Sequence, residues 1–128
     1  MISIVIPIYN EEENLQNLYS RLTAAAPSWN EEYELVLVDD GSADGSLDMM
    51  KAFAKSDAHV RIIKLSRNFG HQPAISAGIQ EAKGNAVVIM DGDLQDPPEE
   101  LYRFLEKWRE GYQVVYAIRT KRKEGFFK

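Results

Sequence analysis

Strand-like and helix-like segments alternate along this chain, and this alternation constrains its fold more than any other feature. Apolar, β-branched runs bounded by turn residues predict five buried strands, at residues 2–8, 35–38, 60–65, 86–90 and 114–117. The stretches between them place apolar residues three and four positions apart, which is the spacing of an amphipathic helix. Strict alternation with short loops predicts an α/β, Rossmann-like fold, with a mostly parallel sheet and helices on both faces.

The expected order of the strands predicts where a ligand would bind. Right-handed crossovers leave few topologies, and in a 3-2-1-4 order the direction of winding reverses between the first and fourth strands. Ligands bind at such a crevice. Tyr9 and Glu11 would then lie on one side of it and residues 91–93 on the other, with Asp39 and Asp40 next door at the end of the second strand.

Length, charge and cysteine content exclude several classes of protein. A chain of 128 residues has room for one domain. It contains no cysteine, which excludes a disulfide framework and a thiolate metal site, and its net charge of −5 argues against a general nucleic-acid binder. We expect no signal peptide, because the chain enters a strand at once, and no apolar run approaches the roughly 20 residues that span a bilayer.

The last ten residues, 119–128, differ in charge from the rest of the chain. Five of them are basic and one is acidic, so this tail carries +4 and the preceding 118 residues carry −9. Beside Phe126 and Phe127, such a basic patch is suited to an anionic membrane surface. A solvated, frayed terminus explains the same composition equally well.

The acidic turn that follows the fourth apolar run is a candidate metal site. Residues i and i+2 of an extended segment point the same way, so Asp91 and Asp93 can converge, and Gly92 lets a ligand approach the backbone. Carboxylate oxygens suit Mg²⁺ or Mn²⁺, which take further ligands from a substrate phosphate. Gln95 could add an amide oxygen or bind a sugar. Aspartate is also common in turns for purely structural reasons, and two aspartates at this spacing are a weak pattern.

Two helix starts have the residue pattern of a capping box. Asn10 with Glu13 fits the start of the first helix, and Asp96 with Glu99, around the prolines at 97 and 98, fits the start of the fourth. We therefore assign Asp96 mainly to capping.

Loop residues near the expected crevice can bind a nucleotide, but only with help from a cation. The first loop has no glycine-rich phosphate motif, and acids at residues 11–13 would repel a phosphate, so a diphosphate needs a cation. Asp39 could accept a hydrogen bond from a base imide, or it could serve only a strand-end turn; Tyr9 could pack on the base or ribose. Arg67 is a candidate phosphate or base contact, or a solvated charge. His71 is a helix-start residue, a ligand contact, or neither.

Four motifs in order resemble those of family 2 glycosyltransferases with the A-type fold. They are Ile-Val-Ile-Pro-Ile-Tyr-Asn-Glu at 4–11, Val-Asp-Asp-Gly-Ser at 38–42, Leu-Ser-Arg-Asn-Phe-Gly at 65–70 and Asp-Gly-Asp-Leu-Gln-Asp-Pro-Pro-Glu at 91–99. The last two together look most similar to the polyprenyl-phosphate branch, which includes bactoprenol glucosyltransferases and dolichol-phosphate mannose synthases.

This resemblance implies a role for each matching residue. The residues that would bind the nucleotide sugar are Pro7, Tyr9, Glu11, Asp39, Asp40, Arg67 and Asp91. Asp93, with Asp91 and Gln95, would hold Mg²⁺ or Mn²⁺. Arg119 would meet the phosphate of a lipid acceptor, so that Asp93 and Arg119 are the expected catalytic residues.

The resemblance also implies a reaction and a division of the chain. Residues 1–118 would form a nucleotide-sugar-binding domain, and 119–128 would lead into an acceptor-binding, membrane-associated part beyond Lys128. The implied reaction moves a hexosyl group, from a UDP-sugar as the expected donor, to a polyprenyl phosphate with inversion, at the cytoplasmic face of the membrane. The resemblance is compatible with a monomer or a homo-oligomer.

Two other functions are compatible with part of the pattern. A phospho-accepting receiver domain has a similar length, five strands and an acidic pair, but here the pair follows the second strand rather than the first. A fragment that only binds nucleotide is the other alternative.

Overall fold

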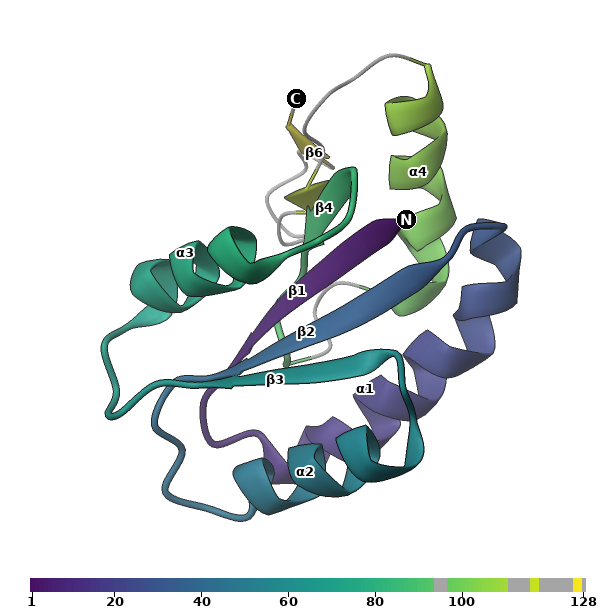
Figure 1. Cartoon of the computed structure of the whole chain (residues 1–128). Coiled ribbons are helices and arrows are strands. Elements are labelled where there is room, and N and C mark those ends of the chain that lie inside the picture. The colour runs from purple at the N-terminus through teal and green to yellow at the C-terminus, as the bar shows by residue number, and fades with distance from the viewer. Residues whose placement is uncertain (94–96, 111–115, 118–125, 128) are drawn as a thin grey trace.

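A four-stranded parallel sheet forms the centre of the computed structural model, which describes residues 1–93, 97–110, 116–117 and 126–127 (Figure 1). Its strands are β1 (Ile2–Ile8), β2 (Tyr33–Asp39), β3 (Val60–Lys64) and β4 (Ala86–Ile89). They are ordered β3-β2-β1-β4, and all neighbours run parallel. The predicted α/β class and the predicted order 3-2-1-4 are confirmed.

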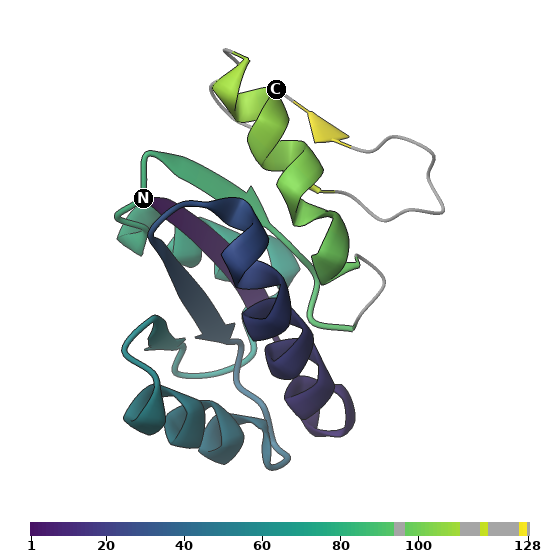
Figure 2. The same ribbon diagram turned by 90° about the vertical axis from the view of Figure 1, so that its right-hand side faces the viewer.

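One face of the sheet is covered by α1, η1, α2 and α4 (Figure 2). Their bounds are Glu12–Ala25, Ala26–Trp29, Ser46–Ser56 and Leu101–Arg109. The isoleucines of β1 occupy every second position of the strand. Because side chains alternate along a strand, all four point to this face and pack with the leucines of α1. The larger part of the buried core lies here.

The other face is covered by α3 (His71–Glu81). Val5, Val36 and Val38 point to this side and pack against Ala74. A Cβ at Gly78 would overlap the side chain of Val5, so the glycine lets α3 approach the sheet closely. This close packing fixes the start of α3 relative to the end of β1.

The capping box predicted for the start of α1 is not formed, and the second one is not tested by the described residues. The N-cap residue of α1 is Glu11, which makes no side-chain cap, whereas Asn10 has a left-handed φ of 54° and accepts a hydrogen bond from the Ala43 amide at 2.8 Å. Asn10 therefore joins two loops and does not cap the helix. Asp96 lies outside the described residues, and the carboxylate of Glu99 binds the guanidinium of Arg21 at 2.6 and 2.8 Å.

The fifth predicted strand also differs. Its described part, β5 (Tyr116–Ala117), pairs antiparallel with β6 (Phe126–Phe127) and forms a separate two-stranded sheet. The sequence predicted that this strand would extend the parallel sheet. The pairing differs because an apolar run indicates a strand but not the strand with which it pairs. Within the described residues, no helix has both the length and the apolar character needed to cross a bilayer.

A buried carboxylate joins three strands near their amino ends, at the edge of the sheet opposite the carboxyl ends. Glu34 of β2 accepts hydrogen bonds from the Ser3 hydroxyl, from Arg61 at 2.8 Å and from the Lys83 amide at 2.7 Å. Burial acts to raise the pKa of Glu34, but these donors outweigh it and hold the pKa below its usual value of 4.5. This network ties the connection before β4 to the rest of the sheet.

Candidate functional site

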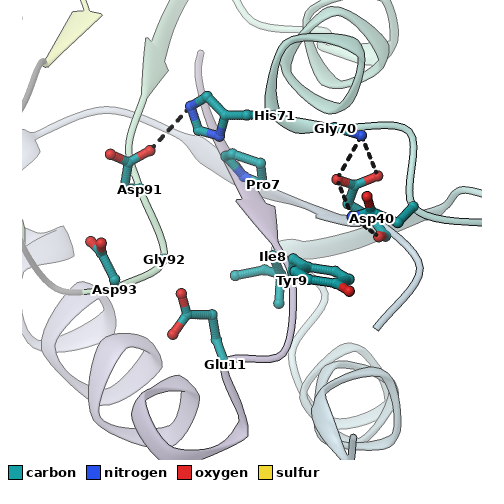
Figure 3. A pocket seen from close by; sticks show the side chains of 11 residues that line it. Pro7, Ile8, Tyr9, Glu11, Asp40, Gly70, His71, Asp91, Gly92 and Asp93 are labelled. Carbon is teal, nitrogen blue, oxygen red and sulfur yellow. Dashed lines mark hydrogen bonds and ion pairs between the residues drawn. The ribbon is translucent and has the colours of Figure 1, made fainter. Parts of the chain in front are cut away.

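A cavity of about 400 Å³ opens at the carboxyl ends of β1 and β4, where the direction of winding reverses (Figure 3). Its lining comes from the carboxyl ends of the four strands and the segments that follow them: Pro7, Ile8, Tyr9, Glu11, Asp40, Asn68, Gly70, His71, Asp91, Gly92 and Asp93. Side chains distant in sequence meet here because the carboxyl ends of parallel strands lie on one edge. The predicted position of the crevice is confirmed.

The wall formed by the end of β1 is held in place by the loop after β2. The amide of Asn10 donates to the Ser42 hydroxyl at 3.0 Å, and the amide of Glu11 donates to the Ser46 hydroxyl at 2.9 Å. Tyr9 lines the cavity with 49% of its surface exposed, so its ring is available to a ligand. The carboxylate of Glu11 accepts a hydrogen bond from its neighbour Asn14 and also lines the cavity.

The opposite wall is formed by the acidic turn after β4. A Cβ at Gly92 would lie 2.7 Å from Cδ1 of Ile8 and 3.3 Å from the Pro7 carbonyl oxygen, so the glycine lets this turn pack against the end of β1 without displacing either group. Asp91 and Asp93 flank the glycine and both line the cavity. The imidazole Nε2 of His71, the first residue of α3, lies 3.4 Å from Asp91 Oδ1.

Asp40 holds the loop that leads into α3. Its buried carboxylate accepts hydrogen bonds from the Asn68 side-chain amide at 3.1 Å, the Phe69 amide at 2.8 Å and the Gly70 amide at 3.1 Å. Gly70 has a φ of 112°, a conformation that residues with a side chain rarely adopt. Asp40 borders the cavity, but its carboxylate accepts hydrogen bonds from this loop, so its role in the structure is to shape the wall.

Two other predicted site residues, Asp39 and Arg67, are not among the described residues that line the cavity. Asp39 is buried and its Oδ1 accepts a hydrogen bond from the Ser42 amide at 3.1 Å, which matches the strand-end turn considered as its alternative. The guanidinium of Arg67 lies 4.1 Å above the ring of Phe69, on the surface. Contacts of Asp39 and Arg67 with a ligand remain predictions. Gln95 and Arg119 lie outside the described residues.

Sequence reasoning missed Asn68 and Gly70 as cavity residues and left His71 undecided. Their position after the third predicted strand was the available signal, because every loop at the carboxyl edge can reach the crevice. The sequence does not reveal that the carboxylate of Asp40 accepts hydrogen bonds from this loop and so holds it beside the cavity.

The residues present fit a divalent cation whose coordination shell is completed by the bound nucleotide. Among the described residues, no group of three or more histidine or acidic side chains is arranged to hold a metal. Mg²⁺ in nucleotide-dependent enzymes commonly takes only one or two carboxylates, with phosphate oxygens and water completing the octahedron. Asp91 and Asp93 supply two hard oxygen donors at the cavity wall, which is the chemistry such an ion requires.

Comparison with known proteins identifies the family. The sequence profile of glycosyl transferase family 2 matches residues 3–128. The chain belongs to glycosyl transferase family 2. This agrees with the four motifs, each of which contributes residues to the cavity wall.

Relatives within glycosyl transferase family 2 match this chain over nearly its whole length. The uncharacterized glycosyltransferase YkcC of Bacillus subtilis is 54% identical over 127 residues, which cover 98% of this chain and 39% of that protein. The undecaprenyl-phosphate 4-deoxy-4-formamido-L-arabinose transferase of Yersinia pestis is 44% identical over 128 residues, covering 99% and 39%. The chain thus spans about 39% of the length of these curated relatives.

Solved structures share the fold of this family 2 chain. The mannosyltransferase PcManGT of Pyrobaculum calidifontis, in complex with GDP-Man and Mn²⁺, aligns with 82% of this chain and 31% of its own, with a TM-score of 0.72 and 21% identity. S. aureus TarS in complex with UDP-GlcNAc aligns with 72% and 26%, with a TM-score of 0.61 and 23% identity. At these identities the likeness establishes the A-type glycosyltransferase fold.

The strand order argues separately against a receiver domain. Receiver domains of the CheY kind have the order 2-1-3-4-5, with the third strand beside the first. Here β3 lies beyond β2 and β4 lies beside β1. The acidic pair therefore does not occupy a receiver's phosphorylation site.

Proposed function

We propose that this chain is the donor-binding part of a metal-dependent, inverting glycosyltransferase. It moves a hexosyl group from a nucleotide sugar, with a UDP-sugar as the expected donor, to a polyprenyl phosphate. The observation that carries the proposal is the cavity between Tyr9 and Glu11 on one side and Asp91 and Asp93 on the other, at the switch point of a family 2 sheet.

The charge of the cavity supports metal dependence. Its described lining includes four carboxylates, from Glu11, Asp40, Asp91 and Asp93, and neither lysine nor arginine. A nucleoside diphosphate carries negative charge of its own and would be repelled from such a wall unless a cation lay between them. Mg²⁺ or Mn²⁺ held by Asp93 with Asp91, and by Gln95 if it lies close, would supply that charge and stabilise the departing diphosphate.

The activity of a relative and the chemistry of phosphates support a polyprenyl phosphate as the acceptor. The Yersinia pestis relative is named as a transferase to undecaprenyl phosphate. A phosphate acceptor is already anionic near neutral pH, so transfer to it does not require a strong general base, and none is assigned here. The sugar in that name is an arabinose derivative, a pentose, so donors of both sizes belong in the assay.

The remainder of the proposal concerns the end of the chain. Residues 1–118 form the nucleotide-sugar-binding domain, and residues 119–128 lead toward the part that binds the acceptor at the cytoplasmic face of the membrane. Arg119 is suited to the acceptor's phosphate, because a guanidinium matches two phosphate oxygens, and the net charge of +4 in this tail favours an anionic surface. A product that enters a cell-envelope glycan is consistent with this location.

Calorimetric titration tests the donor site directly. UDP, GDP and their sugars should bind the purified protein in the presence of Mn²⁺ and lose most of their affinity when the metal is removed by a chelator. Asp93→Ala should remove the metal-dependent part of the binding and leave the melting temperature near that of the wild type, because Asp93 lies at the cavity rather than in the core.

A matched control is available on α2. Asp48 is an exposed aspartate that does not line the cavity, and Asp48→Ala should leave nucleotide binding unchanged. Equal affinity with and without Mn²⁺, or undiminished binding by Asp93→Ala, would contradict the proposed function.

A further inference from the structure

We propose that His71 is a donor-contacting residue, whose imidazole donates a hydrogen bond to a phosphate oxygen of the nucleotide sugar. The inference rests on the proposed function and adds to it a residue outside the acidic turn and the first loop. It begins from the composition of the cavity wall, where His71 is the one basic side chain among the described residues.

The contact between His71 and Asp91 leaves room for a better partner. Nε2 of His71 lies 3.4 Å from Asp91 Oδ1, whereas a good N–H to oxygen hydrogen bond measures about 2.7–3.2 Å. The side chain of His71 is 54% exposed, so a ligand in the cavity can reach it. A phosphate oxygen is a charged acceptor like the carboxylate of Asp91, and at the usual hydrogen-bond distance it would bind the imidazole more strongly than the carboxylate does at 3.4 Å.

The position of His71 within the cavity selects the phosphates over the base. Figure 3 shows the imidazole on the side of Asp91, across the cavity from the side where Tyr9 and Asp40 lie. Asp91 and Asp93 form the part of the wall suited to a cation, which in turn binds phosphate oxygens. A base packed on Tyr9 would therefore place the diphosphate, rather than the nucleoside, within reach of His71.

The backbone before His71 is fixed in advance of binding. Asp40 accepts hydrogen bonds from the amides of Phe69 and Gly70, the two residues that precede His71. Gly78 then holds α3 close to the sheet, so the helix that begins with His71 has little freedom to shift. A contact residue held in this way loses little conformational entropy when the ligand binds.

Three histidine variants separate a phosphate contact from a general effect. In the presence of Mn²⁺, His71→Ala should weaken the binding of UDP and GDP by about tenfold, the loss expected for one hydrogen bond to a charged group. His71→Gln keeps a side-chain N–H near the position of Nε2 and should recover most of that affinity. His59→Gln changes the other histidine, which stacks on Tyr33 away from the cavity, and should have no effect.

Nucleosides provide the second arm of the experiment. The weak binding of uridine and guanosine, followed by saturation-transfer NMR, should be the same in the wild type and in His71→Ala, because neither ligand carries a phosphate. Thermal melting of each variant establishes that it is folded.

The outcomes distinguish this inference from the proposed function. If the wild type binds UDP or GDP in a Mn²⁺-dependent way and His71→Ala binds them equally well, the phosphate contact is wrong and the donor site stands. If His71→Ala loses nucleosides and diphosphates alike, His71 shapes the cavity as a whole and the inference is again wrong. If the wild type binds neither UDP nor GDP, both proposals fail.

Discussion

Replacing Asp40 by alanine should destabilise the protein and release the loop at residues 66–70. The buried carboxylate accepts hydrogen bonds from the side chain of Asn68 and from the amides of Phe69 and Gly70. Each hydrogen bond to a charged group contributes roughly 1.5–3 kcal/mol. In Asp40→Ala the two backbone donors lose their acceptor, while the side chain of Asn68 can rotate toward solvent.

The expected loss of stability is estimated from the two backbone amides, which cannot rotate toward solvent as the side chain of Asn68 can. The loop borders the cavity, so water partly replaces the carboxylate, and the lower value applies to each of the two amides. The expected loss is therefore about 3 kcal/mol in the free energy of unfolding, or roughly 10 °C in Tm for a chain of this size. This is a large fraction of the roughly 5–15 kcal/mol that stabilises most domains.

Urea unfolding followed by tryptophan fluorescence measures the free-energy change, and amide hydrogen exchange locates it. Exchange at the amides of Phe69 and Gly70 should accelerate in Asp40→Ala more than exchange within β1. Asp48→Ala, on the exposed side of α2, should stay within about 0.5 kcal/mol of the wild type. An Asp40→Ala protein with wild-type stability and wild-type protection at these two amides would refute the assigned role of the carboxylate.

Three further substitutions test other parts of the structure. Glu34→Gln should lower the free energy of unfolding by about 1–3 kcal/mol at pH 7; because the folded-state pKa of Glu34 is lowered, the deficit should shrink as the pH falls below 4.5. Burial and the hydrogen bond to Asp57 raise the pKa of Tyr19 to about 12, so this pair stabilises the fold below pH 10 and loses its contribution as the pH rises toward 12. Tyr19→Phe should remove a late-titrating tyrosine from an absorbance titration at about 295 nm and cost about 1 kcal/mol at pH 7. Gly92→Ala should force the acidic turn away from Ile8, at a cost of about 1–3 kcal/mol, and weaken Mn²⁺-dependent nucleotide binding in calorimetry. Wild-type behaviour in any of these measurements would contradict the corresponding contact.

The sheet could be predicted from sequence because its information is local and repeated. Each of the first four apolar runs is a strand in the structure, and short connections with right-handed crossovers leave the order 3-2-1-4 as one of few arrangements. The fifth run failed in part because the partner of a short strand is a non-local property. Tyr116–Ala117 pairs with Phe126–Phe127, about ten residues later, rather than with β4.

Helix starts were less predictable, because the same polar residue can satisfy several partners. Asn10 and Glu13 have the spacing of a capping box, yet the amide of Ala43 lies within reach of Asn10 only after the chain has folded. A left-handed backbone at Asn10 then takes its side chain out of the capping position.

The part of the candidate site that could be predicted consists of polar residues that directly follow a strand. Asp91 and Asp93 follow a strand directly, and Tyr9 and Glu11 follow the strand beside it, so their meeting could be inferred from the strand order. The opposite is true of Asp40. Its residue type suggested a ligand contact, but its three donors come from a loop about thirty residues away, and no local pattern reveals them.

A crystal structure of the protein with Mn²⁺ and UDP or GDP, with data collected at the manganese absorption edge, tests the central claim most directly. We predict an anomalous peak at the acidic turn, about 2.0–2.3 Å from a carboxylate oxygen of Asp93, with the diphosphate completing the coordination and the base beside Tyr9. A manganese peak or a nucleotide bound elsewhere, with the turn at residues 91–93 free of both, would contradict it.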